Sequence, residues 1–106
     1  MPDAAVLTDA DDGGHVSLKV GETVLLELAE NPTTGFRWDL QPFEGSCLRE
    51  HDDRFEAGAG IGAGGLRRLR IVATKAGEED IRLVLIRPWG PREPARALSI
   101  HVTVSP

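Results

Sequence analysis

The chain lacks the devices that stabilise many small domains from outside a hydrophobic core. Cys47 is its only cysteine, which excludes an intrachain disulfide and a cysteine-based zinc cluster. No apolar run approaches the ~20 residues that a membrane-spanning helix needs. With 106 residues, the chain is long enough for one domain with its own core and too short for two ordinary ones. The fold must therefore be held together by its core alone.

The acidic balance of the chain limits its partners. It carries 12 Lys and Arg against 17 Asp and Glu, a formal net charge of −5, which disfavours capture of nucleic acid. The segment that begins Met1-Pro2 has neither the basic nor the long apolar region of a signal peptide. We expect a cytoplasmic location, or a periplasmic or secreted one if the chain is trimmed from a longer precursor. We also expect a monomer with no cofactor, no metal, no nucleic acid and no membrane partner.

Apolar and polar residues alternate over most of the chain, which is the pattern of half-buried β-strands. The expected strands are 15–20, 23–29, 36–40, 66–74, 80–86 and 97–105, with one or two short strands within 47–55. Trp38 lies on one of them and is expected in the core. Seven to eight short strands without a helix predict an all-β fold, an immunoglobulin-like antiparallel β-sandwich without a disulfide.

Residues 1–14 differ in composition from the rest. They are rich in aspartate and end in two glycines, which predicts a flexible acidic N-terminal arm. Residues 15–106 are expected to form a single domain, because no linker and no internal repeat interrupts them.

A glycine-rich stretch, residues 58–65, contains a formal G-x-G-x-x-G at Gly60, Gly62 and Gly65. A dinucleotide site needs a helix directly after these glycines. A strand pattern with several arginines follows instead, so the nucleotide interpretation is rejected. Two readings stay open: a flexible loop, or a backbone surface that a partner can approach closely because glycine has no Cβ.

No catalytic or metal-binding set is evident. His15, His51 and His101 lack close metal-ligand spacing, and His51-Asp52-Asp53 is interpreted as a solvated turn. No nucleophile comes with an evident base, so we expect no enzyme; Cys47 is interpreted as a structural, half-buried thiol. The arginines of one series are interpreted as a solvated sheet face rather than an anion site: Arg67, Arg68, Arg70 and Arg82.

The segment 31–35 has the composition of a stiff turn. Asn31 can hydrogen-bond the backbone just ahead of it, Pro32 fixes φ, and Gly35 permits a positive φ. Thr33 and Thr34 then stand side by side at the apex, which suggests a contact surface rather than a plain turn.

A second candidate contact segment is Arg87-Pro88-Trp89. A tryptophan between prolines is hard to bury in a core, and Trp and Arg are enriched at binding hot spots. Trp89 is therefore interpreted as a binding residue, in preference to a lid folded onto the end of the sandwich.

In their order and spacing, these three segments resemble the motifs of the chagasin family of protein inhibitors of papain-like cysteine peptidases. The resemblance runs from about residue 15 to residue 104. It implies that three adjacent loops (31–35, 58–65 and 87–94) enter the peptidase cleft and inhibit reversibly and competitively, with a papain-like peptidase as the partner. The implied contact residues are Asn31, Pro32, Thr33, Thr34, Gly35, Phe36, Gly62, Ala63, Gly64, Gly65, Arg87, Pro88 and Trp89.

The resemblance also implies a role for each loop. Thr33 and Thr34 would face the catalytic Cys and His of the peptidase, residues 62–65 would line one side of the cleft, and Trp89 would stack on aromatic residues at the other side. The alternative is an immunoglobulin-like adhesion or assembly module without inhibitory activity. Loop placement discriminates between them, because the inhibitor requires all three loops at one end of the sandwich.

Overall fold

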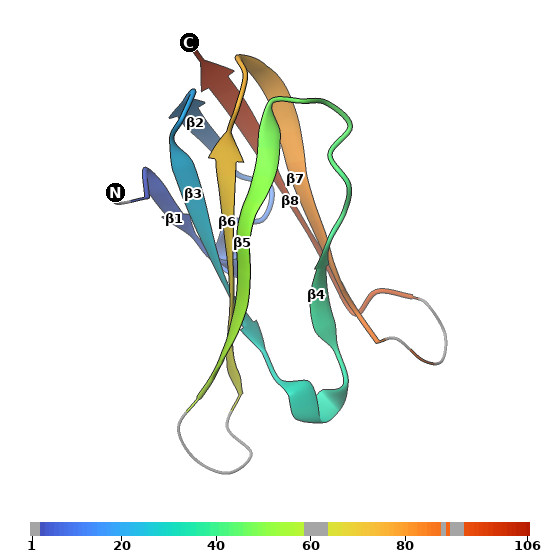
Figure 1. Ribbon diagram of the computed structural model, residues 1–106. Coiled ribbons are helices and arrows are strands. Elements are labelled where there is room, and N and C mark those ends of the chain that lie inside the picture. Colours follow the sequence, from blue (N-terminus) through green and yellow to red (C-terminus); the bar gives the residue numbers. More distant parts are fainter. Residues whose placement is uncertain (1–2, 59–63, 88, 90–92) are drawn as a thin grey trace.

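A computed structural model describes residues 3–58, 64–87, 89 and 93–106 of the chain. Eight strands form two four-stranded sheets packed face to face, ordered β1-β3-β6-β5 and β2-β8-β7-β4 (Figure 1). The strands are β1 Ala5–Leu7, β2 His15–Lys19, β3 Thr23–Glu30, β4 Arg37–Leu40, β5 Leu48–Ala57, β6 Gly65–Ala73, β7 Gly77–Ile86 and β8 Arg96–Ser105, with 3-10 turns η1 Asp9–Asp11 and η2 Pro32–Thr34. The predicted all-β sandwich is confirmed.

The sequence predicts purely antiparallel sheets, but each sheet contains one parallel pair of strands. β1 pairs with β3 in parallel, and β2 pairs with β8 in parallel. Short hairpins force antiparallel pairing only between consecutive strands, whereas these partners are separated along the chain. The first two strands therefore take the outer edge of each sheet, and the remaining strand pairs are antiparallel.

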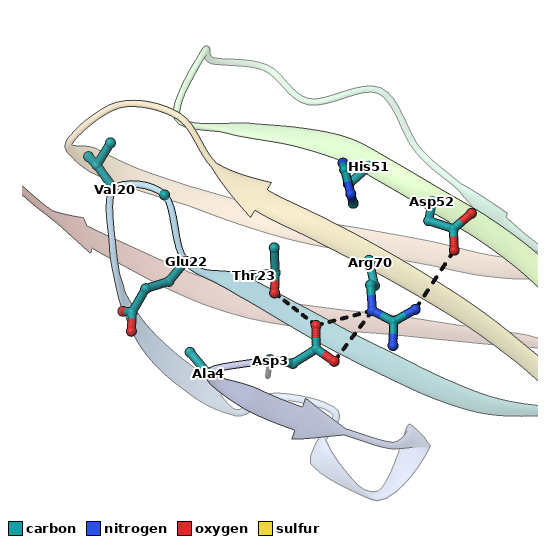
Figure 2. Close-up of a pocket in the computed structure, with 9 residues that line it drawn as sticks. Asp3, Ala4, Val20, Glu22, Thr23, His51, Asp52 and Arg70 are labelled. Carbon is teal, nitrogen blue, oxygen red and sulfur yellow. Dashed lines mark hydrogen bonds and ion pairs between the residues drawn. The ribbon is translucent and has the colours of Figure 1, made fainter. Parts of the chain in front are cut away.

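The sequence predicts a flexible arm over residues 1–14, whereas the structure pairs part of this segment with the sandwich. Ala4 N donates to Thr23 O at 2.8 Å where β1 joins β3, and Ala5 and Leu7 pack against the core. Asp3 accepts a 2.8 Å hydrogen bond from Thr23 Oγ1 and forms a 3.2 Å ion pair with Arg70. Figure 2 shows Arg70 between Asp3 and Asp52. The prediction of a flexible arm rests on the aspartate-rich composition of residues 1–14. A strand of only three residues changes that composition too little to be recognised.

The segment 48–57 is one ten-residue strand rather than one or two short strands. The β5–β6 register shifts between Glu50 and Asp52, so His51 sits at a β-bulge. His51, Asp52 and Asp53 therefore lie in β5 and not in a solvated turn. The extra residue inverts the alternation of side chains halfway along, which hides a long strand from a period-2 pattern.

The core lies between the two sheets and is built mainly from the inward faces of β3, β6, β7 and β8, with single buried side chains from β2, β4 and β5. Its largest fully buried side chains are Leu18, Val24, Leu26, Leu28, Leu69, Ile71, Ile81, Leu83, Ile100 and Val102. Trp38 is buried among them as predicted, and Cys47 is a half-buried free thiol. Within the described ranges, no helix is long and apolar enough to cross a membrane, and no group of three or more His, Cys, Asp or Glu is arranged to hold a metal ion.

A charged cluster occupies the outer face of the second sheet, around His101 on β8. Its Nδ1 lies 2.8 Å from Asp80 Oδ1 and its Nε2 lies 3.0 Å from Glu78 Oε1. Its ring stacks on that of His15, with 5.5 Å between centroids. Hydrogen bonds to Glu78 and Asp80 raise the pKa of His101, and the same hydrogen bonds lower the pKa of both carboxyls.

These shifts predict how stability depends on pH. The contribution of His101 is complete below its unfolded pKa of about 6.5 and is lost as the pH rises through the raised folded value. The contributions of Glu78 and Asp80 are present above their ordinary pKa values and are lost as the pH falls through the lowered ones. We expect the free energy of urea unfolding to decline on the alkaline side in the native chain and less so in His101→Gln.

The matched control is His51→Gln, which changes an exposed histidine on the other sheet. This variant should keep the alkaline decline of the native chain. Equal slopes for the native chain and His101→Gln, measured between about pH 5 and pH 9, would contradict the assignment.

Candidate functional site

Three inter-strand connections lie at the same end of the sandwich. We call them the first loop (residues 31–36, between β3 and β4), the second loop (58–64, between β5 and β6) and the third loop (87–95, between β7 and β8). The strand ends that carry them all lie at the lower end in Figure 1, away from the C-terminus. The loop placement that the inhibitor requires is therefore present.

The first loop is the stiff turn that its sequence predicts. Asn31 Oδ1 accepts hydrogen bonds from Thr33 N at 3.1 Å and from Thr33 Oγ1 at 2.7 Å. Asn31 O accepts from Thr34 N at 3.1 Å and from Thr34 Oγ1 at 2.8 Å. Gly35 has φ +79°, the left-handed conformation that favours glycine. One asparagine thus organises the whole η2 turn.

These bonds decide what the two exposed threonines offer to a partner. Each hydroxyl has one proton, and in both residues that proton is donated within the loop. Thr34 Oγ1 also accepts from Phe36 N at 3.3 Å. The hydroxyl oxygens therefore present lone pairs outward and are suited to accept hydrogen bonds from a partner.

The third loop rests on the first. Trp89 is 59% exposed, yet one side of its indole lies directly on the Gly35 backbone. A Cβ added at Gly35 would stand 2.5 Å from both Cη2 and Cζ2 of Trp89. The Arg87 guanidinium lies 4.7 Å from the centre of the Phe36 ring, in cation–π range. Two contacts thus join these loops before any partner arrives.

The second loop begins and ends beside the first. Gly58 N donates to Gly64 O at 2.9 Å and closes the loop at its base. A Cβ on Gly64 would stand 3.5 Å from Glu30 O and 3.6 Å from Asn31 Cβ, so the two backbones are close neighbours. Gly62, Ala63 and Pro88 lie outside the described residues, and their contact roles stay predictions.

Gly65 belongs to β6 rather than to the loop, and its need for glycine is local. A Cβ there would collide with Glu56 O and would stand 2.7 Å from Phe55 Cζ. The close approach of β5 to β6 therefore explains this glycine.

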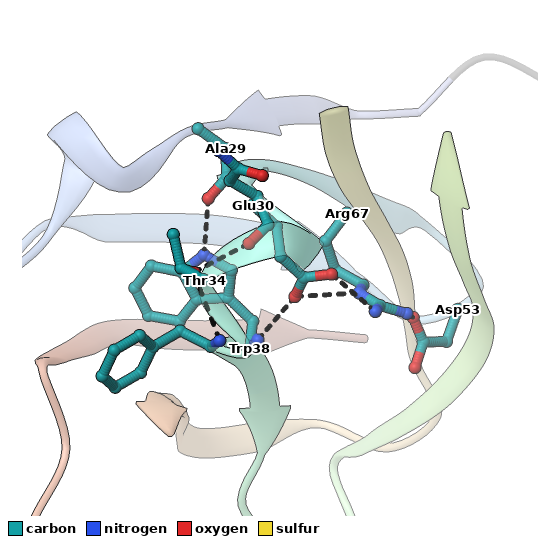
Figure 3. Close-up of polar contacts among 8 residues, drawn as sticks. Ala29, Glu30, Thr34, Trp38, Asp53 and Arg67 are labelled. Carbon is teal, nitrogen blue, oxygen red and sulfur yellow. Dashed lines mark hydrogen bonds and ion pairs between the residues drawn. The ribbon is translucent and has the colours of Figure 1, made fainter. Parts of the chain in front are cut away.

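A buried polar network at the loop end was missed by the sequence analysis. Glu30 is 6% exposed, and its Oε2 pairs with Arg67 Nη2 at 2.7 Å. Its Oε1 accepts from Trp38 N at 2.6 Å, while Trp38 Nε1 donates to Ala29 O at 3.0 Å. Arg67 Nη1 reaches Asp53 Oδ1 at 3.1 Å, and Figure 3 shows the whole network. We call Glu30, Trp38, Asp53 and Arg67 the loop-end network.

The alternation of the strands contained a signal for this network. In β3, Val24, Leu26 and Leu28 face the core, so Glu30 continues their face. In β6, Arg67 likewise continues the core-facing row of Leu69 and Ile71. Arg68, Arg70 and Arg82 lie on outer sheet faces in ion pairs, as predicted. The prediction is wrong for Arg67, because its side chain points into the sandwich.

The electrostatics of Arg67 follow from this position. Burial alone would lower the pKa of its guanidinium, but hydrogen bonds to Glu30 and Asp53 outweigh burial and raise it. The side chain is therefore always charged, and it also lies over the Phe55 ring at 5.6 Å.

A cleft of about 350 Å³ opens between the first loop, the third loop and the ends of β5 and β6. Its lining residues within the described part of the chain are Glu30, Gly35, Phe36, Arg37, Phe55, Arg67 and Trp89. Aromatic rings and arginines of this kind are typical of protein–protein contact surfaces.

Comparisons with known proteins agree with this arrangement. The model of the family described as Chagasin family peptidase inhibitor I42 matches residues 17–104. Amoebiasin-1 of Entamoeba histolytica is 33% identical over 99 residues, covering 92% of this chain and 97% of the relative. Chagasin of Trypanosoma cruzi is 29% identical over 103 residues, covering 91% and 94%.

Among solved structures, the crystal structure of a cysteine protease inhibitor from Entamoeba histolytica superposes with a TM-score of 0.86. It is 24% identical, and the match covers 99% of this chain and 100% of that one. The sandwich described above is therefore the fold of that inhibitor. With the family model matching residues 17–104, the chain belongs to the chagasin family: it is an inhibitor of papain-like cysteine peptidases and not an enzyme.

Proposed function

We propose that this inhibitor acts reversibly and competitively, by placing its three loops together in the active-site cleft of the peptidase. The observation that supports it is that the loops are already joined in the free chain. Trp89 lies on Gly35, Arg87 lies over Phe36, and Gly64 lies beside Asn31. Loops that are fixed beforehand lose little conformational entropy on docking, which favours tight binding.

The first loop has the chemistry to block catalysis without being cleaved. Its η2 turn is compact, whereas a peptidase cleft binds extended backbone, so no carbonyl of this turn is presented as a substrate's would be. The oxygen of Thr33 is free to accept, because its proton is donated to Asn31. It would accept from the imidazolium N–H of the thiolate–imidazolium pair in the peptidase, rather than donate to the thiolate.

Titration of papain with the purified chain tests this proposal. We expect the apparent KM for a peptide substrate to rise with inhibitor concentration while kcat stays constant, and activity to return on dilution. Mass spectrometry should recover the inhibitor uncleaved. Trypsin, which presents a serine nucleophile instead of a thiolate, is the control and should keep full activity. A lack of inhibition at micromolar concentration across several papain-like enzymes, or cleavage within residues 31–36, would overturn the proposal.

A further inference from the structure

We propose that Glu30 is a positioning residue, which holds the three loops in the arrangement that binds the peptidase without contacting the peptidase itself. This inference rests on the proposed function. It is carried by the position of the loop-end network, which touches the base of the first loop and both strands that bound the second loop.

The network closes the first loop where the backbone does not. β3 and β4 belong to different sheets, so the two ends of the first loop do not share a strand ladder. Two hydrogen bonds join them instead: Trp38 N to Glu30 Oε1 at 2.6 Å, and Trp38 Nε1 to Ala29 O at 3.0 Å. The Glu30 carboxylate thus fixes the span over which Asn31 to Phe36 must turn.

The same carboxylate ties this span to the second loop. Arg67 binds Glu30 through Nη2 at 2.7 Å and through Nε at 3.4 Å. It lies on β6 shortly after the second loop, and through Nη1 it reaches Asp53 in the middle of β5, the strand that leads into that loop. Both strands that carry the second loop are therefore held at a set distance from the first.

The third loop is held indirectly. Trp89 rests on Gly35, and both residues line the 350 Å³ cleft into which Glu30 and Arg67 also face. A change in the path of the first loop would move the surface on which the indole lies. All three loops thus depend on one carboxylate that is itself buried.

Because the network is buried, we expect it to fix the geometry of the loops more than to raise the free energy of unfolding. The side chains of Glu30 and Arg67 are 3% and 14% exposed. Replacing a buried ion pair by apolar residues is often neutral for stability, whereas its hydrogen bonds select one arrangement among similar ones. Leucines at these two core-facing positions would fill the space without fixing the loops.

A positioning role predicts a particular kinetic change. If only a fraction of the folded inhibitor holds its loops correctly, the association rate constant falls by that fraction. The dissociation rate constant changes little, because the peptidase itself holds the loops in the complex. Glu30→Gln isolates the positioning effect. The side-chain amide oxygen of the glutamine can still accept from Trp38 N, but its NH2 group faces the Arg67 guanidinium, so that two donors oppose each other.

The experiment measures association and dissociation of each variant with papain, with urea unfolding as the check on folding. We expect Glu30→Gln to associate about tenfold more slowly, with dissociation unchanged within about twofold and the variant fully folded. Arg67→Met should show the same loss, and the double variant should lose no more than either single change, because the pair acts as one unit. Glu44→Gln is the matched control. It breaks the exposed ion pair, 2.9 Å long, between Glu44 on the β4–β5 connection and Arg82 on β7, and this variant should associate normally.

The outcomes separate this inference from the proposed function. If the native chain does not inhibit papain, the proposed function fails. If the native chain and Glu44→Gln inhibit and Glu30→Gln associates normally, or if its loss lies only in dissociation, the positioning role is overturned. Should Glu30→Gln not fold, Asp53→Asn gives the test, since it removes the more exposed partner of Arg67 and should slow association to an intermediate degree.

Discussion

Gly35→Ala is expected to weaken inhibition of papain about 30-fold while the sandwich stays folded. A Cβ at this position would stand 2.5 Å from two indole carbons and must displace Trp89. Loss of a hot-spot aromatic costs about 2 kcal/mol, which corresponds to about 30-fold in the inhibition constant. The side chain at φ +79° also adds backbone strain of roughly 1–2 kcal/mol, which lowers the free energy of unfolding.

Gly13→Ala provides a matched control for this prediction. Gly13 has the same φ of +79°, but a Cβ there meets nothing within 4 Å. The two variants should lose similar free energy of urea unfolding, because they bear the same backbone strain. Only Gly35→Ala should lose inhibition. Equal inhibition constants for both variants would show that the contact between the first and third loops has no part in binding.

Trp89→Ala is expected to weaken inhibition about 30-fold, which corresponds to about 2 kcal/mol. More than half of the Trp89 surface is free to bury against a partner, while the face on Gly35 holds the ring in place. The measurement is the inhibition constant for papain. Val20→Ala, which trims another exposed apolar side chain away from the three loops, is the control and should leave inhibition unchanged.

Combining the two substitutions tests whether they act through one contact. Gly35→Ala removes the seat of the indole, and Trp89→Ala removes the indole itself. The double variant should therefore lose clearly less binding free energy than the two single losses added together. Full additivity would mean that Trp89 and Gly35 contribute independently, contrary to their contact in the free chain.

Much of the fold could be predicted from alternation alone. The core-facing rows of β6, β7 and β8, such as Leu98, Ile100 and Val102, appear directly as a period of two. β1 could not be predicted, because three residues among aspartates carry too little hydrophobic signal. β5 was divided because the bulge at His51 changes the phase of the pattern. The parallel pairing of the edges depends on distant partners, which no local pattern specifies.

The features of the candidate site also separate into those that local sequence predicts and those that depend on the fold. The stiffness of the first loop follows from Asn31, Pro32 and Gly35, since turn chemistry is local. The seat of Trp89 on Gly35 joins two distant segments, and only the fold brings them together. Arg67 and Glu30 were visible as charges in core-facing rows. Their pairing still required knowing that β3 and β6 are neighbours.

The short first strand has a consequence for how copies of this protein meet one another. Without β1, the outermost strand of its sheet would be β3, eight residues long and rich in valine and leucine. An uncovered apolar strand of that length is a template on which another chain can pair and aggregate. The three residues of β1 therefore protect this sheet edge from pairing with another chain. They cover β3 and leave a short edge strand, followed by an acidic turn, at the margin of the sheet.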